Sequence, residues 1–271
     1  MKLHKKSEDT TPVFDAIVLA GERKRHSELL DHFKVPAKSF IEVAGEPMIS
    51  RVLKALLKSK CIEKIYLCGQ DQGLFRKIPL LDQLMKSHRI VWIQNEKGPS
   101  LSTYKALGMT GGQRPVLLTT SDHALLQGEH VRFFCQEALK KDADLKVGLA
   151  PLEILAKYPQ VKRTSYRFKD GAFCTCNLFG FMNEASFEAA RFWMGLEEKR
   201  KHPARVVMGF GILWALRYLL GLLSLGDALE RASRVIGCRV DAVIMNYPEA
   251  AIDVDTLDDW RLAQEIASSL Y

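Results

Sequence analysis

The chain has 271 residues, 47% of them hydrophobic and 26% charged, which is an ordinary globular composition, and its 10 prolines and 18 glycines exclude collagen-like and disordered classes. Lysine and arginine number 39 against 32 aspartates and glutamates, so the formal net charge is +7. A basic surface suits nucleic acid, an anionic membrane or phosphorylated small molecules. No zinc-finger, RNP or helix-turn-helix pattern accompanies the basic residues, so we expect no nucleic-acid partner.

After a polar leader at 1–12, the first half of the chain alternates between predicted strands and helices. Residues 13–20 form a near-continuous apolar run that ends at Gly21, which is typical of a buried parallel strand. Residues 47–60 predict a helix, because their apolar side chains fall on one face at helical spacing. Further strands are expected at 64–68, 89–93 and 115–120, and helices at 100–107 and 129–140. This alternation predicts a doubly wound α/β sheet.

The second half of the chain is less regular. Strands are expected at 144–150, 177–182 and 239–245, and a closing helix at 257–269. Residues 184–236 show a mostly helical pattern, with breaks near Pro203 and Gly226. We therefore predict a single domain over 13–271 that carries a helical insertion at 184–236.

The insertion contains an unusually apolar stretch, 206–225, with 15 apolar residues of 20 but also Arg217 and three glycines. We interpret it first as a buried or interface helix, second as a membrane-surface helix and third as a membrane span. Residues 204–225 are accordingly where we expect a homodimer interface or a peripheral membrane contact. Six cysteines show no paired framework and no signal peptide precedes them, which predicts a cytoplasmic protein, with membrane association through this helix as the alternative.

Ligands of an open parallel sheet bind beyond the carboxyl ends of its strands, so the loop after the first strand is a candidate site. Glycine in such a loop permits close approach of backbone N–H groups to a phosphate, and cations supply the charge that a polyphosphate needs. The residues concerned are Leu19, Ala20, Gly21, Glu22, Arg23 and, after a basic stretch, Lys38. A strand–glycine–loop sequence alone is a weak signal.

Carboxylates follow two other segments. Asp122 comes just after the strand at 115–120, and Asp253 and Asp255 lie in the sequence AIDVD. Mg²⁺ binds one or two carboxylates together with substrate phosphates, and on a strand Asp253 and Asp255 would point to the same face, where one can join Asp122 on a metal. The structural alternative is capping of a turn by Asp122 and of the last helix by Asp255 or Thr256.

The order of these motifs is more specific than any one of them. The set L-A-G-x-R, P-A-K, G-P-S-x-S, a strand ending in T-S-D, and D-V-D-T-x-x-D resembles the nucleotidyltransferases related to molybdenum-cofactor guanylyltransferase, the MobA-like NTP transferases, and the cytidylyltransferases of isoprenoid and polyol phosphate metabolism. The resemblance covers about 13–150 and 240–269. It implies a glycosyltransferase A-type, Rossmann-like fold with a mostly parallel sheet, and the reaction NTP + X-phosphate → NDP-X + pyrophosphate with Mg²⁺.

The resemblance also implies roles for individual residues. Ala20, Gly21 and Arg23, with Leu19 and Glu22 in the same loop, match the segment that wraps the triphosphate; Lys38 matches the lysine near the α-phosphate; and the base is held by Gly98, Pro99 and Ser100. Asp122 corresponds to the first metal carboxylate and Asp255 to the second, with Asp253 as a substitute. The first loop departs from the family pattern, because Glu22 stands where a second glycine is usual and the loop is long and charged.

The same resemblance places Arg163, Arg167 and Asn177 at the acceptor, where guanidinium groups suit a phosphate and an amide suits a hydroxyl. Solvation of a surface hairpin is the structural alternative. We expect Lys38, Arg23 and Asp122 to be the catalytic groups, CTP or GTP to be the nucleotide, and a polyol, sugar or inositol phosphate to be the acceptor. Two rival functions are a glycosyltransferase of the same fold with a nucleotide-sugar donor and a non-catalytic nucleotide-binding scaffold.

Overall fold

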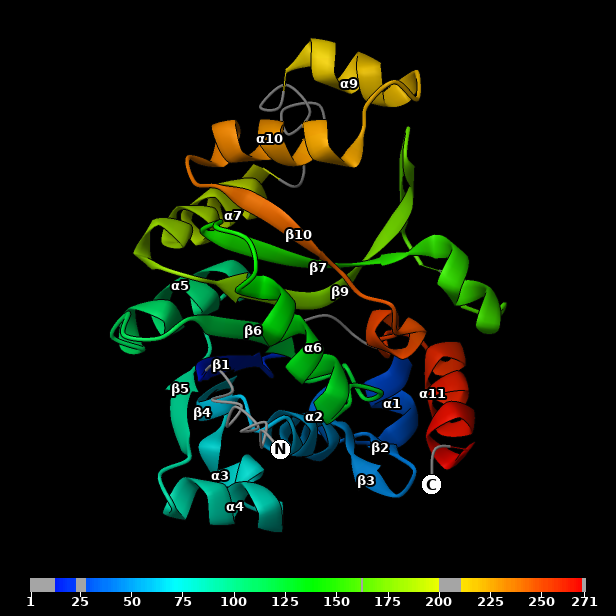
Figure 1. Ribbon diagram of the computed structural model, residues 1–271. Coiled ribbons are helices and arrows are strands. Elements are labelled where there is room, and N and C mark those ends of the chain that lie inside the picture. The colour runs from blue at the N-terminus through cyan, green and yellow to red at the C-terminus, as the bar shows by residue number, and fades with distance from the viewer. Residues whose placement is uncertain (1–12, 23–27, 162, 200–210, 270–271) are drawn as a thin grey trace, which may run out of the picture.

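The computed structural model describes residues 13–22, 28–161, 163–199 and 211–269. Its centre is an eight-stranded sheet in the order β10-β7-β9-β6-β1-β4-β5, with β8 paired to β9 (Figure 1). The strands are β1 (Phe14–Leu19), β4 (Ile62–Gly69), β5 (Ile90–Gln94), β6 (Val116–Thr120), β7 (Leu145–Pro151), β8 (Tyr166–Phe168), β9 (Gly171–Phe181) and β10 (Val240–Ile244). All neighbours are parallel except those of β9, so the expected mostly parallel α/β sheet is confirmed.

Helices cover both faces of the sheet (Figure 1). One face packs against α2 (Met48–Lys58), α4 (Pro79–Lys86), α6 (Gly128–Ala138) and α11 (Leu257–Ser269). The other packs against α5 (Pro99–Met109) and α7 (Phe187–Lys199). Shorter elements connect them: α1 (Glu28–Phe33), α3 (Gln72–Phe75), the 3-10 helices η1 (Lys38–Phe40), η2 (Leu152–Lys157), η3 (Glu184–Ser186) and η4 (Pro248–Ala251), and the hairpin of β2 (Glu42–Val43) and β3 (Glu46–Pro47).

The position of β1 explains its nearly continuous apolar sequence. Phe14, Ala16 and Val18 belong to the core on one face of the sheet, and Ile17 belongs to the core on the other. A central strand that is buried on both sides favours apolar residues on both faces. The exception in β1 is Asp15, a buried carboxylate that accepts the N–H of Lys64. The register sets Leu19 of β1 opposite Thr120 of β6, and the N–H of Ser121 donates to the Leu19 carbonyl at 3.0 Å. The loops that follow β1 and β6 therefore start side by side.

The described part of 184–236 is helical, as the pattern predicts, but it is divided into shorter elements. After η3 and α7 come α9 (Ile212–Leu219) and α10 (Leu225–Ile236), which lie together at one end of the molecule (Figure 1). The chain turns between them at Gly221, whose φ of 68° favours glycine. Of the apolar stretch, residues 206–210 lie outside the described residues. No helix among those that the structure describes is long and apolar enough to cross a membrane.

Candidate active site

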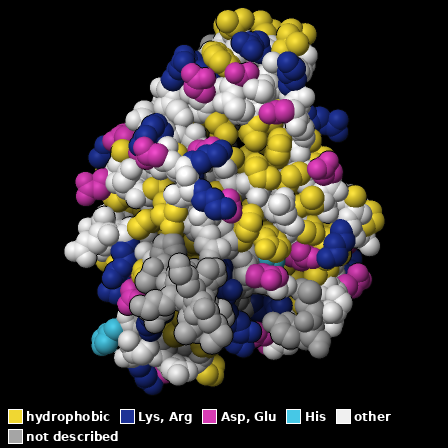
Figure 2. All heavy atoms as spheres, in the orientation of Figure 1, with side chains coloured by type: hydrophobic (Ala, Val, Ile, Leu, Met, Phe, Trp, Pro, Cys, Tyr) yellow, Lys and Arg dark blue, Asp and Glu magenta, His cyan; other side chains and the backbone are white. Residues whose placement is uncertain are grey.

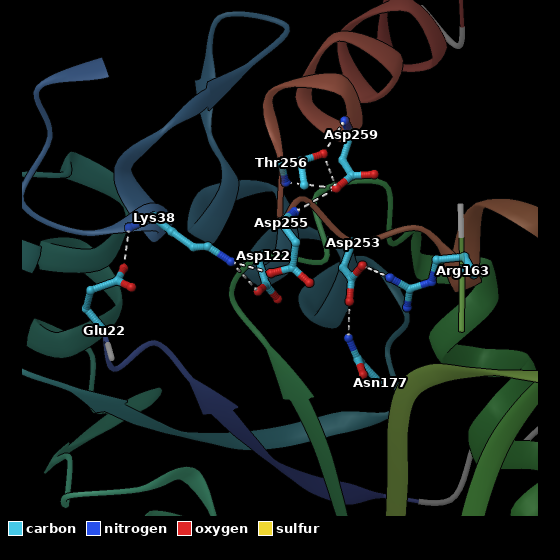
Figure 3. Close-up of polar contacts among 9 residues, drawn as sticks. All are labelled: Glu22, Lys38, Asp122, Arg163, Asn177, Asp253, Asp255, Thr256 and Asp259. Atoms are coloured by element: carbon cyan, nitrogen blue, oxygen red, sulfur yellow. Dashed lines mark hydrogen bonds and ion pairs between the residues drawn. The ribbon is translucent and has the colours of Figure 1, made fainter. Parts of the chain in front are cut away.

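Three charged side chains from distant parts of the sequence meet beyond the carboxyl end of β6 (Figure 3). The Nζ of Lys38 lies 2.6 Å from Oδ1 of Asp255 and 3.4 Å from Oδ2 of Asp122. Lys38 begins η1, Asp122 follows β6, and Asp255 lies just before α11. The structure thus brings together the lysine and two of the three aspartates that the sequence singled out.

The loop 252–256 positions these groups, and it is irregular, so the strand geometry considered for Asp253 and Asp255 does not occur. Val254 is buried, and its N–H donates to the carbonyl of Asp122 at 3.1 Å. Thr256 caps α11, because its Oγ1 accepts the N–H of Asp259 at 3.2 Å while Oδ2 of Asp259 accepts the N–H of Thr256 at 2.8 Å (Figure 3). The capping role considered for Asp255 therefore falls to Thr256.

The surroundings of Lys38 keep its side chain protonated. Burial disfavours the charged ammonium, but the carboxylates of Asp122, Asp255 and Glu22 outweigh that effect, and the pKa of Lys38 is raised above its ordinary value. Glu22 also accepts the main-chain N–H of Lys38 through Oε2 at 2.9 Å. Glu22 therefore contacts the backbone of Lys38, a role that its sequence position after Gly21 did not suggest.

Asp253 lies in a second cluster, with two of the candidate acceptor residues (Figure 3). One oxygen of Asp253, Oδ1, pairs with Nη1 of Arg163, and the other, Oδ2, accepts from Nδ2 of Asn177 at 2.7 Å. The side chains of Asp253 and Arg163 are 9% and 16% exposed, so the ion pair is largely shielded from solvent. Both carboxylate oxygens of Asp253 have protein partners, whereas Oδ1 of Asp122 is buried without a hydrogen-bond partner in the structure.

The second cluster lies close to the end of β6 and has an unusual backbone. Asn177, within β9, has a φ of 49°, in the left-handed region that asparagine adopts more readily than most residues but that is unusual inside a strand. His123, next to Asp122, is fully buried; burial lowers its pKa to about 3, and the charges of His130 and Arg163 act in the same direction. His123 is therefore neutral at physiological pH.

A third group of candidate residues surrounds Gly21. A Cβ on Gly21 would lie 2.9 Å from Nδ2 of Asn95, so only glycine lets the loop after β1 approach the end of β5 this closely. Gly98 is the residue before α5, Pro99 begins that helix and Ser100 follows. Gly21 is thus brought beside Asn95, three residues before Gly98, where the residues that the resemblance assigned to the base begin. Asn95 had no sequence signal beyond its place after a predicted strand.

Four candidate residues from the sequence remain, and the structure describes three of them. Leu19 ends β1, and Ala20 uses its N–H on the carbonyl of Cys68 at 2.8 Å. Arg167 lies on β8, where its main-chain N–H donates to the Tyr218 hydroxyl at 3.4 Å. Arg23 lies outside the described residues. Among the described residues there is no group of three or more His, Cys, Asp and Glu side chains that could hold a metal ion without a substrate.

Comparison with known proteins assigns this chain to a family. The family model of the MobA-like NTP transferase domain matches residues 16–151, half of the chain, which includes β1, η1 and β6 with Lys38 and Asp122. The chain belongs to the MobA-like NTP transferase family. It is accordingly a nucleotidyltransferase, and the resemblance read from its motifs is confirmed. No curated protein matches the chain.

Solved structures extend the similarity beyond the matched segment of the MobA-like domain. A hypothetical transferase from Thermus thermophilus is 28% identical with a TM-score of 0.76, over 92% of this chain and 99% of that one. A putative glucose-1-phosphate thymidylyltransferase from Bacillus anthracis is 13% identical with a TM-score of 0.59, over 94% and 95% of the two chains. A 4-diphosphocytidyl-2C-methyl-D-erythritol synthase from Anaerococcus prevotii is 15% identical with a TM-score of 0.54, over 95% and 97%. The last two similarities show the shared fold.

Proposed function

We propose that this MobA-like protein transfers a nucleotidyl group from an NTP to a phosphorylated small molecule, with Mg²⁺ as cofactor and pyrophosphate as the second product. The acceptor's phosphate oxygen attacks the α-phosphorus, and the bond from that phosphorus to the oxygen of the β-phosphate breaks. The observation that carries the proposal is the adjacency of two clusters, Lys38 with Asp122 and Asp255, and Arg163 with Asp253 and Asn177, joined by the loop 252–256.

The first cluster fits a divalent cation. Oδ1 of Asp122 is buried without a hydrogen-bond partner in the structure, which is costly unless a cation or a ligand satisfies it. Asp122 and Asp255 already share one cation, the ammonium of Lys38. Mg²⁺ needs only one or two protein carboxylates because the phosphates of the substrate supply further oxygens. Bound by Asp122 and Asp255, Mg²⁺ would offset negative charge on the triphosphate.

The side chains of this chain supply orientation and charge. Lys38, kept protonated, stabilises negative charge that develops at the α-phosphate and on the leaving pyrophosphate. An acceptor phosphate is already an anion at neutral pH, so the reaction requires no general base, and the neutral, buried His123 is consistent with that. The main demand is alignment of the two phosphate groups.

The second cluster supports acceptor binding. A guanidinium has five N–H donors in a fixed plane and suits a phosphate, and an Arg163 held by Asp253 is already oriented before the acceptor binds. Asn177 shares the same carboxylate, so its amide is fixed as well. We therefore assign Asp253 to the positioning of Arg163 and Asn177 and not to the metal.

One experiment tests the identity of both the nucleotide and the acceptor. We propose CTP or GTP as the nucleotide, and a polyol, sugar or inositol phosphate as the acceptor. The names of two structural relatives, a glucose-1-phosphate thymidylyltransferase and a 4-diphosphocytidyl-2C-methyl-D-erythritol synthase, support these classes. A matrix of four NTPs against these three acceptor classes, with Mg²⁺ and read as pyrophosphate release, identifies the pair. Pyrophosphate that appears only with one NTP and one acceptor supports the proposal. Release of free nucleoside diphosphate from a nucleotide sugar would instead indicate a glycosyltransferase. Tight NTP binding without turnover on any acceptor would indicate a non-catalytic scaffold.

A further inference from the structure

The helix α9 has two different faces. Its inner face is aromatic: Trp214 lies beneath the guanidinium groups of Arg217 and Arg231, at 5.4 and 5.8 Å from the ring centroid, and the Tyr218 ring lies 5.9 Å from that of Phe168. These contacts join α9 to α10 and to β8. The inner face of α9 is therefore occupied by its own chain.

The outer face of α9 carries only aliphatic side chains. Five residues follow the spacing i, i+1, i+4, i+7 and i+8, which places them in one stripe along the helix, and a sixth aliphatic residue follows in the turn to α10. All six are 50 to 77% exposed: Ile212, Leu213, Leu216, Leu219, Leu220 and Leu222. We call these six residues the α9 stripe. In Figure 2, hydrophobic side chains gather at the top of the molecule, where Figure 1 shows α9.

The size of the α9 stripe sets it apart from ordinary surface leucines. Its six side chains expose on the order of 700 Å², more than the ~300–600 Å² of the largest apolar patch on a typical monomer. A standard protein–protein interface buries ~800 Å² on each partner. A second chain that presents the same stripe would match this area.

The chemistry of the surroundings favours a second protein chain over a lipid surface. Helices that lie on membranes carry Trp, Phe or Leu on the exposed apolar face and a polar face rich in lysine or arginine. Here the aromatic residues point inward, and the neighbouring charges are of both signs: Arg217 pairs with Asp227 at 3.7 Å, and Arg234 pairs with Glu230. Among the described residues of α9 and α10, the surroundings of the stripe therefore lack aromatic anchors and the uniformly positive polar face of an anionic-lipid site.

We propose that the α9 stripe docks against the same stripe of a second copy of this chain, in an antiparallel helix pair related by a two-fold axis. Such an axis makes the surface complementary to itself, which an uncharged aliphatic stripe satisfies without any pairing of charges. Leu216 lies at the middle of the stripe, so the axis passes close to it. The proposal is independent of the proposed reaction.

Light scattering combined with gel filtration tests the dimer. The full chain is expected to elute with twice the 30.6 kDa of one copy, and the Leu216→Glu/Leu219→Glu double variant with 30.6 kDa. Both side chains are exposed in one copy, so the variant is expected to fold and to keep the far-UV circular dichroism spectrum of the parent chain. Met109→Glu, an exposed apolar residue at the end of α5, is the matched control and is expected to remain dimeric.

A cysteine probe tests the geometry. The six native cysteines are all buried and unpaired, so one introduced thiol on the surface is the reactive one. Leu216→Cys is expected to form a disulfide-linked dimer with a mild oxidant, and Met109→Cys is not. The proposal is overturned by a parent chain that stays monomeric at high concentration, by a double variant that remains a dimer, or by a monomer whose stripe instead mediates sedimentation with phosphatidylcholine and phosphatidylserine vesicles.

Discussion

The carboxylates of Asp253 and Asp255, two residues apart in one loop, have different partners. Oδ1 of Asp255 accepts from Nζ of Lys38 at 2.6 Å, whereas Oδ2 of Asp253 accepts from Nδ2 of Asn177 at 2.7 Å (Figure 3). Val254 between them is buried and hydrogen-bonds the carbonyl of Asp122. Since the backbone is fixed at Val254, the two flanking side chains reach opposite clusters. Substitutions at the two aspartates are therefore expected to change different kinetic parameters.

Loss of a carboxylate from the first cluster is expected to reduce turnover. Asp122→Asn and Asp255→Asn each remove one negative charge that holds Lys38 and, as proposed, Mg²⁺. By analogy with the loss of one charge-stabilising group, kcat is expected to fall by roughly 10² to 10³ in a pyrophosphate-release assay. Asp258→Asn, in the exposed first turn of α11, is the matched control and is expected to keep full activity. Full turnover by Asp122→Asn would show that this carboxylate has no part in the reaction.

Asp253→Asn separates acceptor positioning from metal binding. The amide keeps the size of the carboxylate but removes the charge that holds Arg163. We expect KM for the acceptor to rise about tenfold, equal to ~1.4 kcal/mol, while KM for the NTP and the Mg²⁺ concentration at half-maximal rate stay unchanged. If the Mg²⁺ requirement rises instead, Asp253 is a metal ligand and the positioning role is wrong.

The positions of most strands and of the main helices could be predicted, because a strand buried on both sides of a parallel sheet has a nearly continuous apolar sequence, as β1 does. The meeting of Lys38 with Asp122 was also predictable, because both follow chain segments that end at one edge of the sheet. The divergence of Asp253 and Asp255 was not. AIDVD has the alternation of a strand, but the hydrogen bond of Val254 to Asp122 and the Thr256 cap give that loop another course.

Contacts that depend on one side chain reaching a distant backbone atom could not be predicted either. Glu22 is a charged loop residue in the sequence, and only the fold brings its carboxylate to the N–H of Lys38. Asn95 is likewise a plain loop residue in the sequence, and only the fold brings its side chain close to Gly21. The spacing of apolar residues in a sequence indicates which face of a helix or strand is buried, but it does not predict single contacts of this kind.

The hydrogen bond between the Glu22 carboxylate and the N–H of Lys38 is testable by two substitutions of Glu22. Glu22→Ala removes the acceptor of the Lys38 N–H, which lets η1 shift and moves the ammonium away from Asp122 and Asp255. We expect kcat to fall about tenfold. Glu22→Gln keeps an oxygen that accepts the same hydrogen bond and is expected to restore most of the rate. Equal loss in both variants would mean that the charge of Glu22 matters, not its hydrogen bond.

The close approach of Gly21 and Asn95 is testable by a pair of substitutions. In Gly21→Ala the new methyl group would meet Nδ2, Cβ and Cγ of Asn95 at 2.9 to 3.1 Å, so the loop after β1 must shift. Overpacking of this kind costs ~1–3 kcal/mol, and we expect a lower unfolding midpoint and a higher KM for the NTP. Adding Asn95→Ala to Gly21→Ala leaves a Cβ but removes the amide and is expected to recover part of both. No recovery would place the cause in the backbone of Gly21.

His130 predicts a loss of stability in mild acid. It is buried against Tyr247, with ring centroids 4.6 Å apart, and burial lowers its pKa to about 4. Histidine in an unfolded chain has a pKa near 6.5, so between these values the unfolded state binds more protons and the free energy of unfolding falls as the pH drops. Titration of His130 accounts for up to ~3 kcal/mol of the free energy of unfolding, and His123, whose pKa burial also lowers, acts in the same direction.

Urea unfolding at pH 7, 6, 5 and 4.5 measures how steeply the free energy of unfolding depends on pH. We expect His130→Gln to reduce the pH dependence and the control His88→Asn, at an exposed position where φ is 57°, to leave it unchanged. A slope in His130→Gln equal to that of the parent chain would contradict the assignment.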